Sequence, residues 1–405
     1  MRNKVSLMGW LLLVVCFVST GVMAADTTGV TDTEVRIGLF FPTTGPASLW
    51  GIPPLHAITT ILNQMNEAGG VHGRKVKVFL EDDAGNPEKA KGAVKKLIYD
   101  TKVFALMGTG ASLAAFAAKQ EIEAARVPWL GAPAIMDKIY VPAFPTTFSY
   151  GLTSNVDAQS MARFVLTKPD VKKIAFVYHY DDWGEGLLGA AVKVLEEHKA
   201  TKVEWTSEVV EKGITDATAV VLKVKNYNPD FMIGFLYPTE GPVFIRDAYK
   251  YGLKVPIVFN TALSDLTDVK NRSGIPESMK WVFASTYGTA AISDPKFADL
   301  VNAMKGYFPQ TRPQPQNFIG FAGGRLLVEA LRRSGRDLTR EKFVDVLEDI
   351  KDFETGVLPS KISYSKTSHI GLKGCTFVTL RKDGTDYYLL EPKWDPVILK
   401  KKNWE

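Results

Sequence analysis

The feature that most restricts the fold is a regular alternation of short apolar runs, rich in β-branched residues, with longer amphipathic runs. The stretch "EVRIGLFFP" (34–42) predicts a strand. The following "PLHAITTILNQMNEAGG" predicts a helix that begins at Pro53-Pro54 and ends at Gly69-Gly70. Next come a strand "RKVKVFL", a helix with Asn86 as its N-cap, and further strands at 103–107 and 127–133. This order predicts βαβ units built on a parallel sheet.

A second series of the same kind begins near Asn155. Four strand-like runs, "KKIAFVYHY", "KVEWTSEVV", "DFMIGFL" and "VPIVFN", are separated by helix-like runs. Two consecutive series predict an α/β protein with two Rossmann-like lobes, each built on a parallel sheet. A third section adds three predicted helices and the strand-like runs "CTFVTLRKDG" and "DYYLLEPKW", which must pack against the two lobes.

The first residues predict export. Arg2 and Lys4 precede a short apolar run, "GWLLLVVCFV", and small residues follow, a pattern typical of a signal peptide that is cut after Ala24. Cleavage would remove Cys16, leave Cys375 without an internal disulfide partner, and lower the formal net charge from +5 to +3. The remaining charges are dispersed, without a basic block interleaved with aromatic residues, so nucleic acid is not an expected partner.

The motif content argues against an enzyme. The five histidines lack paired metal-ligand spacing, and the predicted mature chain has too few cysteines for a Cys-x-x-Cys site. The sequence contains neither a G-x-S-x-G elbow nor a phosphate loop, and "GTGASL" places Leu113 where a dinucleotide fingerprint needs its third glycine. We therefore expect no catalytic residue, no metal and no cofactor.

One turn is suited to an anion. Gly108 to Ser112, "GTGAS", lies between a predicted strand and a predicted helix. Such a turn presents unpaired backbone N–H groups and the positive end of the helix dipole, and a serine hydroxyl adds a further donor. A small carboxylate fits this arrangement without a basic side chain. The alternative is that Ser112 only caps the helix.

Large aromatic side chains follow three predicted strands. Trp50 follows the first strand of the first series, and Trp183 and Tyr237 follow strands of the second series. Ligands of parallel α/β sheets bind beyond the carboxyl ends of the strands. Each residue alone is more often a packing residue than a ligand contact, but together with the donor-rich turn the three suggest an aromatic-walled cleft with one polar end.

These segments carry a family resemblance. "VRIGLFFPTTGPASLWG", "NEAGGVHGRKVKVFLEDDAGNPEKA", "YHYDDWGEG" and "AYKYGLKVPIVFN" resemble the motifs of periplasmic leucine/isoleucine/valine-type solute-binding proteins of ABC importers. The resemblance implies the type I periplasmic binding protein fold, with two lobes joined by a three-segment hinge and the ligand in the cleft between them. It places residues 32–152 and 285–359 in the first lobe, and residues 153–284 and 360–405 in the second.

The resemblance also implies roles for single residues. Ser112 would hold the ligand carboxylate, helped by the turn residues Gly110 and Ala111 and by backbone groups near Pro133 and Ala134. Four positions differ from the family pattern or extend it. Ile135 stands where a threonine is expected, Trp50 and Trp183 replace tyrosines, and Thr261 replaces the acid that binds a ligand ammonium. The remaining contact implied by the resemblance is Tyr237, which keeps its identity. Tyr287, near the second crossing, is a further candidate contact.

These departures favour a carboxylate ligand without an α-ammonium and with an apolar or aromatic body, because a buried ammonium without an anionic partner is costly. A branched-chain or aromatic amino acid is the alternative, with Asp265 or Glu240 as the substitute acid. The expected partner is a membrane ABC permease, and a monomer is expected. The competing classes are a ligand-sensing receptor of the same fold and a secreted enzyme.

Overall fold

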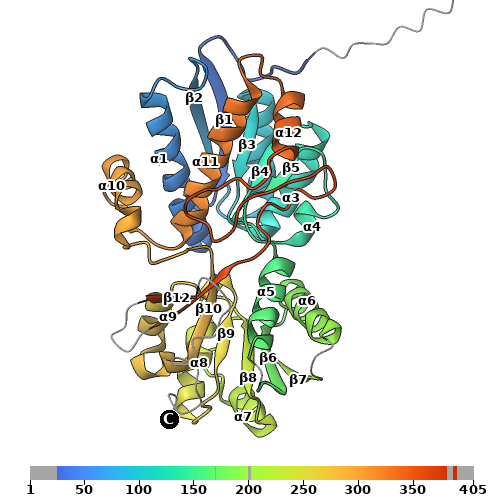
Figure 1. Cartoon of the computed structure of the whole chain (residues 1–405), viewed down its shortest axis with the longest axis vertical. Helices are drawn as coiled ribbons and strands as arrows, with labels where there is room; N and C mark the ends of the chain where they lie inside the picture. Colours follow the sequence, from blue (N-terminus) through green and yellow to red (C-terminus); the bar gives the residue numbers. More distant parts are fainter. Residues whose placement is uncertain (1–24, 169, 199–201, 381–385, 390–405) are drawn as a thin grey trace, which may run out of the picture.

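The computed structural model describes residues 25–168, 170–198, 202–380 and 386–389, so the predicted signal peptide lies outside the described residues. Figure 1 shows two α/β lobes, one above the other, joined by thin connecting segments. Among the described residues the strands form one five-stranded sheet, ordered β2-β1-β3-β4-β5, and one seven-stranded sheet, ordered β12-β11-β10-β9-β8-β6-β7. This arrangement confirms the predicted α/β fold with two lobes.

The first lobe contains a wholly parallel sheet. Its strands are β1 (Glu34–Phe41), β2 (Lys75–Asp82), β3 (Ala105–Gly108), β4 (Trp129–Gly131) and β5 (Thr147–Ser149). Its helices are α1 (Ile52–Glu67), α2 (Pro87–Lys95), α3 (Ser112–Ala124), α4 (Asp137–Tyr140), α10 (Ala298–Tyr307), α11 (Gln316–Ser334) and α12 (Arg340–Glu348).

The second lobe contains a parallel sheet with two antiparallel strands added at one edge. Its strands are β6 (Lys173–His179), β7 (Glu204–Val210), β8 (Phe231–Phe235), β9 (Ile257–Phe259), β10 (Val282–Thr286), β11 (Thr376–Leu380) and β12 (Asp386–Leu389). Its helices are α5 (Ser154–Leu166), α6 (Asp182–Glu197), α7 (Thr218–Tyr227), α8 (Gly241–Lys250) and α9 (Leu266–Ser273).

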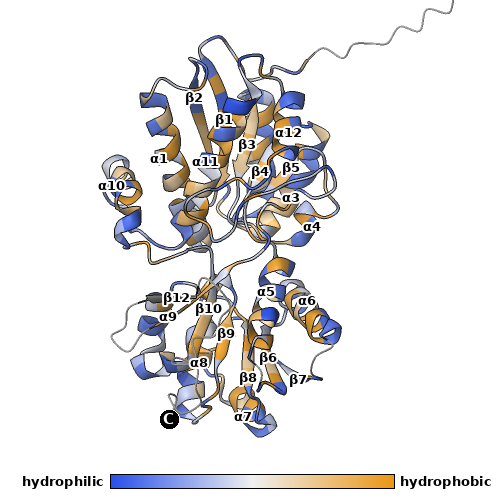
Figure 2. Ribbon diagram, in the orientation of Figure 1, coloured by the Kyte–Doolittle hydropathy of each residue, from blue (hydrophilic) through white to orange (hydrophobic). Residues whose placement is uncertain are grey.

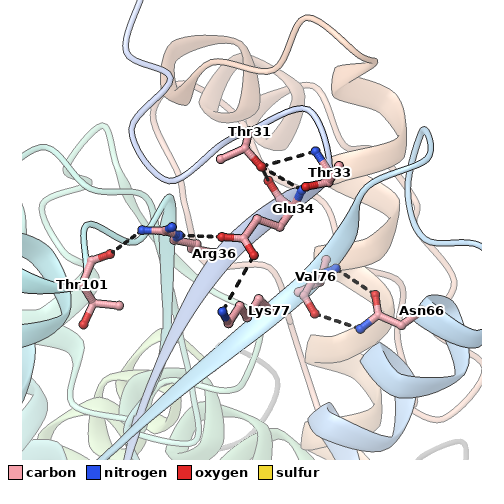
Figure 3. A network of polar contacts seen from close by, with 8 residues as sticks. All are labelled: Thr31, Thr33, Glu34, Arg36, Asn66, Val76, Lys77 and Thr101. Atoms are coloured by element: carbon pink, nitrogen blue, oxygen red, sulfur yellow. Dashed lines mark hydrogen bonds and ion pairs between the residues drawn. The ribbon is translucent and has the colours of Figure 1, made fainter.

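Local sequence signals account for several of these elements. The predicted N-cap of α2 is confirmed, since the Asn86 side chain accepts hydrogen bonds from Glu88 and Lys89. At the outer end of the first sheet, Asn66 of α1 pairs with both backbone groups of Val76 on β2 and so ties the helix to the strand (Figure 3). Gly320 lets α11 approach α1 closely, because a Cβ there would lie 2.3 Å from the Pro54 carbonyl oxygen.

Hydrophobic side chains fill both lobes. Figure 2 shows apolar strands flanked by helices whose apolar stripes face them and whose polar stripes face outward, the pattern expected of amphipathic helices on a buried sheet. Across the described residues no helix has the length and apolarity needed to cross a membrane.

Within the part of the chain that the structure describes, three crossing segments join the lobes, namely residues 150–153, 287–294 and 373–375. The chain leaves β5 and β10 at their carboxyl ends to enter these segments. Because β5 is parallel to β4, and β10 is parallel to β9 although antiparallel to β11, the carboxyl ends of the parallel strands in both sheets face the region between the lobes. Ligands of open α/β sheets bind at such strand ends.

The expected lobe boundaries differ from the packing at two places. Ser285 and Thr286, expected in the first lobe, lie in β10 of the second sheet. Residues 360–372, expected in the second lobe, pack on the first. Ile362, Tyr364 and Leu372 are buried in its core, and Ile370 bridges to β5. The apolar pattern of this tail did not indicate which lobe would bury it.

Candidate functional site

The glycine turn of the first lobe lies against Trp50. Trp50 ends a 3₁₀ turn, Pro46–Trp50, that follows β1. A Cβ on Gly110 would lie 2.2 Å from the Trp50 carbonyl oxygen, so only glycine permits this contact. The structure therefore brings Trp50 and Gly110, from loops after β1 and β3, into direct backbone contact.

Helix α3 begins at Ser112 without a side-chain cap. Ala111 occupies the N-cap position, and no side chain of the described residues caps this end. The first helical hydrogen bond is donated by Ala115 to the Ala111 carbonyl oxygen. The N–H groups of Ser112 to Ala114 therefore precede the internal bonds and point toward the start of the helix, where an anion is favoured.

The Ser112 side chain is held by the loop after β4. Its hydroxyl oxygen accepts a hydrogen bond from the Ile135 N–H at 3.1 Å, and Ala134 donates its N–H to the Thr109 carbonyl oxygen at 3.0 Å. Pro133 and Ala134 are buried. Ser112, Ala134 and Ile135 are thus adjacent, and the backbone donors of Ala134 and Ile135 are occupied. The Ser112 hydroxyl hydrogen can donate to a ligand.

The second lobe contributes a pair of stacked rings, Trp183 and Tyr237, which we call the aromatic wall. Their centroids lie 4.5 Å apart with an interplanar angle of 19°. Trp183 is at the start of α6, and Tyr237 follows β8. The ring of buried His179, at the end of β6, packs edge-on against Tyr237 with centroids 4.8 Å apart.

Asp181 organises this wall. Its carboxylate accepts the Gly184 N–H at 2.8 Å, which caps α6, and the Tyr237 hydroxyl at 3.1 Å. Burial, together with the Asp181 charge, raises the pKa of Tyr237 far above its usual range, so the phenol stays a neutral donor. The wall is therefore fixed in place before any ligand arrives.

Two residues that were expected to contact the ligand through their side chains, Thr261 and Tyr287, are buried in this conformation. Thr261 is 2% exposed and donates both its N–H and its hydroxyl to Asp157, at 3.1 and 3.0 Å. Tyr287 is 1% exposed and belongs to the core of the first lobe. Neither side chain is therefore available to a ligand here. The sequence pattern located the two loops but did not indicate which way these side chains turn.

The two acids considered as ammonium partners are already engaged. Glu240 is 1% exposed and accepts hydrogen bonds from the Gly213 N–H and the Thr239 hydroxyl. Asp265 caps α9 through the Asp268 N–H and pairs with Arg312 at 3.3 Å. Each carboxylate therefore has protein partners.

Sequence reasoning missed Asp157, His179 and Asp181. Asp181 could have been found, since "DDWG" before an amphipathic run fits an N-cap. Asp157 and His179 could not. An acid in the first helical turn is an ordinary dipole-favoured residue, and a histidine ending an apolar strand fits a buried side chain.

Comparison with known proteins agrees with this arrangement. A family model described as periplasmic binding protein matches residues 34–385. A Brucella melitensis protein, "Leu/Ile/Val-binding protein homolog 3", is 25% identical over 340 residues, covering 83% of this chain and 89% of that one. The chain therefore belongs to the periplasmic binding protein family. Its relatives within the family are named as Leu/Ile/Val-binding proteins, and its fold is shared with a solved type 1 periplasmic binding protein from Bordetella pertussis.

Two solved structures share the fold. A branched-chain amino acid transporter substrate-binding protein, LivJ of Streptococcus pneumoniae, was solved with isoleucine. Its TM-score is 0.71 at 18% identity, covering 88% of this chain and 99% of that one. A solute-binding protein of an ABC transporter from Rhodopseudomonas palustris BisB5 was solved with 3,4-dihydroxybenzoic acid. Its TM-score is 0.71 at 21% identity, covering 88% and 95%. The relatives are solute-binding proteins rather than enzymes, and the family implies a periplasmic or extracellular location.

Proposed function

We propose that this protein captures a small carboxylate without an α-ammonium, with an apolar or aromatic body, and delivers it to a membrane ABC permease. The carboxylate would bind at the start of α3, to the Ser112 hydroxyl and the N–H groups of the first turn. The body would bind between Trp50 and the aromatic wall, in a cleft that closes by hinge motion. The protein would act as a monomer.

One observation carries this ligand class. At the first-lobe end of the site, the backbone N–H groups that begin α3 have no side-chain cap and can therefore bind an anion. At the second-lobe end, Asp157, Glu240 and Asp265 each already have hydrogen-bond or ion-pair partners within the described residues. A ligand ammonium would have to displace one of these partners, and leaving a charge unpaired in a closed site costs several kcal/mol.

The two structural neighbours mark the two possibilities. The Rhodopseudomonas palustris protein holds 3,4-dihydroxybenzoic acid, an aromatic carboxylate without an amino group, which supports the proposal. The Streptococcus pneumoniae protein holds isoleucine, which supports the alternative of an amino acid. Both have the same fold as this chain, so the fold alone does not distinguish the two ligand classes.

Matched ligand pairs test the proposal. Each pair differs only by the α-amino group: 3-phenylpropanoate against phenylalanine, and 4-methylpentanoate against leucine. A ligand present at about a hundredfold excess over its Kd stabilises the folded state by about 2.7 kcal/mol, which a thermal-shift assay detects. We expect the acid of each pair to raise the Tm more than its amino acid. The reverse order in both pairs would favour the amino-acid alternative.

A further inference from the structure

The carboxylate of Asp157 joins parts of the chain that are distant in sequence. Asp157 lies in the first turn of α5, shortly after the first crossing segment, and is fully buried. One oxygen accepts the N–H and hydroxyl of Thr261, which follows β9. The other accepts the Ser285 hydroxyl at 2.6 Å, on β10 just before the second crossing segment.

The third crossing segment contacts the second one close to Asp157. The Thr376 hydroxyl, at the start of β11, donates to the Gly288 and Thr286 carbonyl oxygens. Cys375 packs against the hydrophobic cores of both lobes. Burial raises the pKa of Cys375, and the charge of Asp157 adds to that rise, which places the thiol near the carboxylate. All three crossing segments therefore converge around Asp157.

Among the described residues no ion pair joins Asp157 to a basic side chain, so its charge is balanced only by the three donors from Thr261 and Ser285. Burial raises the pKa of Asp157, while those donors oppose the rise. Losing these hydrogen bonds would leave a buried carboxylate without partners, which is costly. The contacts therefore strongly restrict the positions of Thr261 and Ser285.

Asp157 holds the loop of residues 260–265. One end of this loop contacts the backbone next to the aromatic wall, and the other end contacts the first lobe. Asn260 accepts the N–H of Leu236, the residue before Tyr237 of the aromatic wall, at 3.1 Å. Asp265 pairs with Arg312, which lies between α10 and α11 of the first lobe. The loop is therefore a continuous physical link between the hinge, the aromatic wall and the opposite lobe.

We propose that Asp157 is a positioning residue that fixes the loop of residues 260–265 on the crossing segments, so that hinge movement and the placement of the aromatic wall are coupled. Asp157 acts through Thr261 and Asn260 and does not touch the ligand. The effect on ligand affinity rests on the proposed function, whereas the effect on the loop does not.

The test compares three variants by hydrogen–deuterium exchange and calorimetry. Asp157→Ala removes all three acceptor contacts. Asp157→Asn removes the charge but keeps an oxygen for Thr261, and the Ser285 hydroxyl can rotate to accept from the amide. Asp247→Ala is the matched control. It deletes another buried carboxylate of the same lobe, on α8, which accepts the Ala217 N–H and pairs with Arg246.

In Asp157→Ala we expect amide exchange in residues 258–266 to rise about tenfold or more, because hydrogen bonds to a charged group are lost. Exchange in β6 should stay unchanged, and the affinity for 3-phenylpropanoate should fall about tenfold. Asp157→Asn should restore most of both properties. Asp247→Ala should lower the Tm without a selective change in residues 258–266.

Two results would overturn the inference. One is unchanged exchange in residues 258–266 of Asp157→Ala. The other is a uniform rise across the second lobe, which indicates simple destabilisation. If the wild-type protein binds no carboxylate of the matched pairs, the proposed function fails, and the exchange measurements on the ligand-free variants still decide the role of Asp157.

Discussion

The loops after β1 and β6 invite comparison, because each carries a tryptophan and each is organised by one carboxylate. In the first lobe Asp82 accepts the N–H groups of Thr43 and Ala84 and the hydroxyl of Thr44. In the second lobe Asp181 accepts one backbone N–H and the Tyr237 hydroxyl. Asp82 thus holds loop backbone and one threonine hydroxyl in the segments around Trp50, whereas Asp181 fixes a second aromatic ring against Trp183.

This difference suggests that the two lobes contribute different kinds of contact to ligand binding. The first lobe offers donors in a turn that is close-packed through Gly110, while the second offers a preformed apolar surface. A ligand can drive closure only if it binds the closed form more tightly than the open form, which requires contacts with both lobes. The predictions below separate the two contributions, beginning with the one expected to be largest.

Ser112→Ala should cause the largest loss of affinity for a carboxylate. The substitution removes a donor to a charged group and also deprives the Ile135 N–H of its acceptor. A hydrogen bond to a charged group contributes about 1.5–3 kcal/mol, so calorimetry should record a loss of roughly ten- to a hundredfold.

Ser154→Ala is the matched control for this prediction. Its hydroxyl donates to the Ile135 carbonyl oxygen at 3.0 Å, on the other side of the same residue. The control should lower stability by about 1 kcal/mol and leave the affinity near the wild-type value. Equal affinity losses in both variants would mean that Ser112 only orders the loop.

Trp183→Ala should cause the next largest loss, because it removes half of the aromatic wall. Aromatic pairs contribute about 0.5–1.5 kcal/mol beyond the area that they bury, so the affinity for 3-phenylpropanoate should fall about tenfold. Trp205→Ala on β7 is the control. Trp205 is 41% exposed, packs edge-on against Phe176 and lies at the amino end of β7, opposite the carboxyl end that faces the candidate site.

Trp50→Ala distinguishes the two lobes further. The backbone of Trp50, rather than its ring, makes the contact with Gly110, so the loop should keep its shape when the ring is removed. Any loss of affinity would then report ring–ligand contact directly. Normal binding by both Trp50→Ala and Trp183→Ala would refute the aromatic contribution altogether.

The sequence predicted the fold because its signals are local. The strand and helix runs and the Asn86 cap need only neighbouring residues to be recognised. The same holds for the glycine turn before α3, although Ala111 rather than Ser112 occupies the cap position. The turn itself predicts an anion site, whereas the contributions of Pro133, Ala134 and Ile135 follow only from the family resemblance.

The parts that escaped prediction depend on contacts between distant residues. Asp157 binds Thr261 and Ser285, which lie 104 and 128 residues further along the chain. No periodicity or spacing indicates such a pairing, so Thr261 was expected to face the ligand when it faces Asp157 instead. The tail of residues 360–372 was assigned to the wrong lobe for the same reason, since its apolar residues fit either core.

The pH dependence of stability tests whether a charge holds the Trp50 loop. Burial alone would raise the pKa of Asp82, but hydrogen bonds from Thr44, Ala84 and Thr43 outweigh it and lower the pKa to about 2. A lowered folded-state pKa gives stability that is complete above the unfolded value, about 3.9. That stability is lost as the pH falls toward 2.

Asp82→Asn should therefore be less stable than the wild type at pH 6, with the difference shrinking between about pH 4 and pH 2, as measured by urea unfolding. Asp83→Asn is the adjacent control with the opposite sign. Burial raises the pKa of Asp83, so the folded state favours its protonated form and gains stability as the pH falls. That variant should lose no stability at pH 6 through its charge.

The smallest effect is expected at the ion pair that joins the lobes. Arg312 lies in the first lobe and is 65% exposed, and its partner Asp265 caps α9 of the second lobe. Exposed pairs contribute about 0.2–1 kcal/mol and weaken with salt. Arg312→Gln should thus shift the balance between open and closed forms only slightly, as a change in ligand affinity of at most about fivefold at low salt.

The change should vanish in 1 M salt, whereas the losses at Ser112 and Trp183 should persist there, because they arise from buried contacts. A salt-independent effect of Arg312→Gln would mean that the side chain positions the loop by packing instead of by charge.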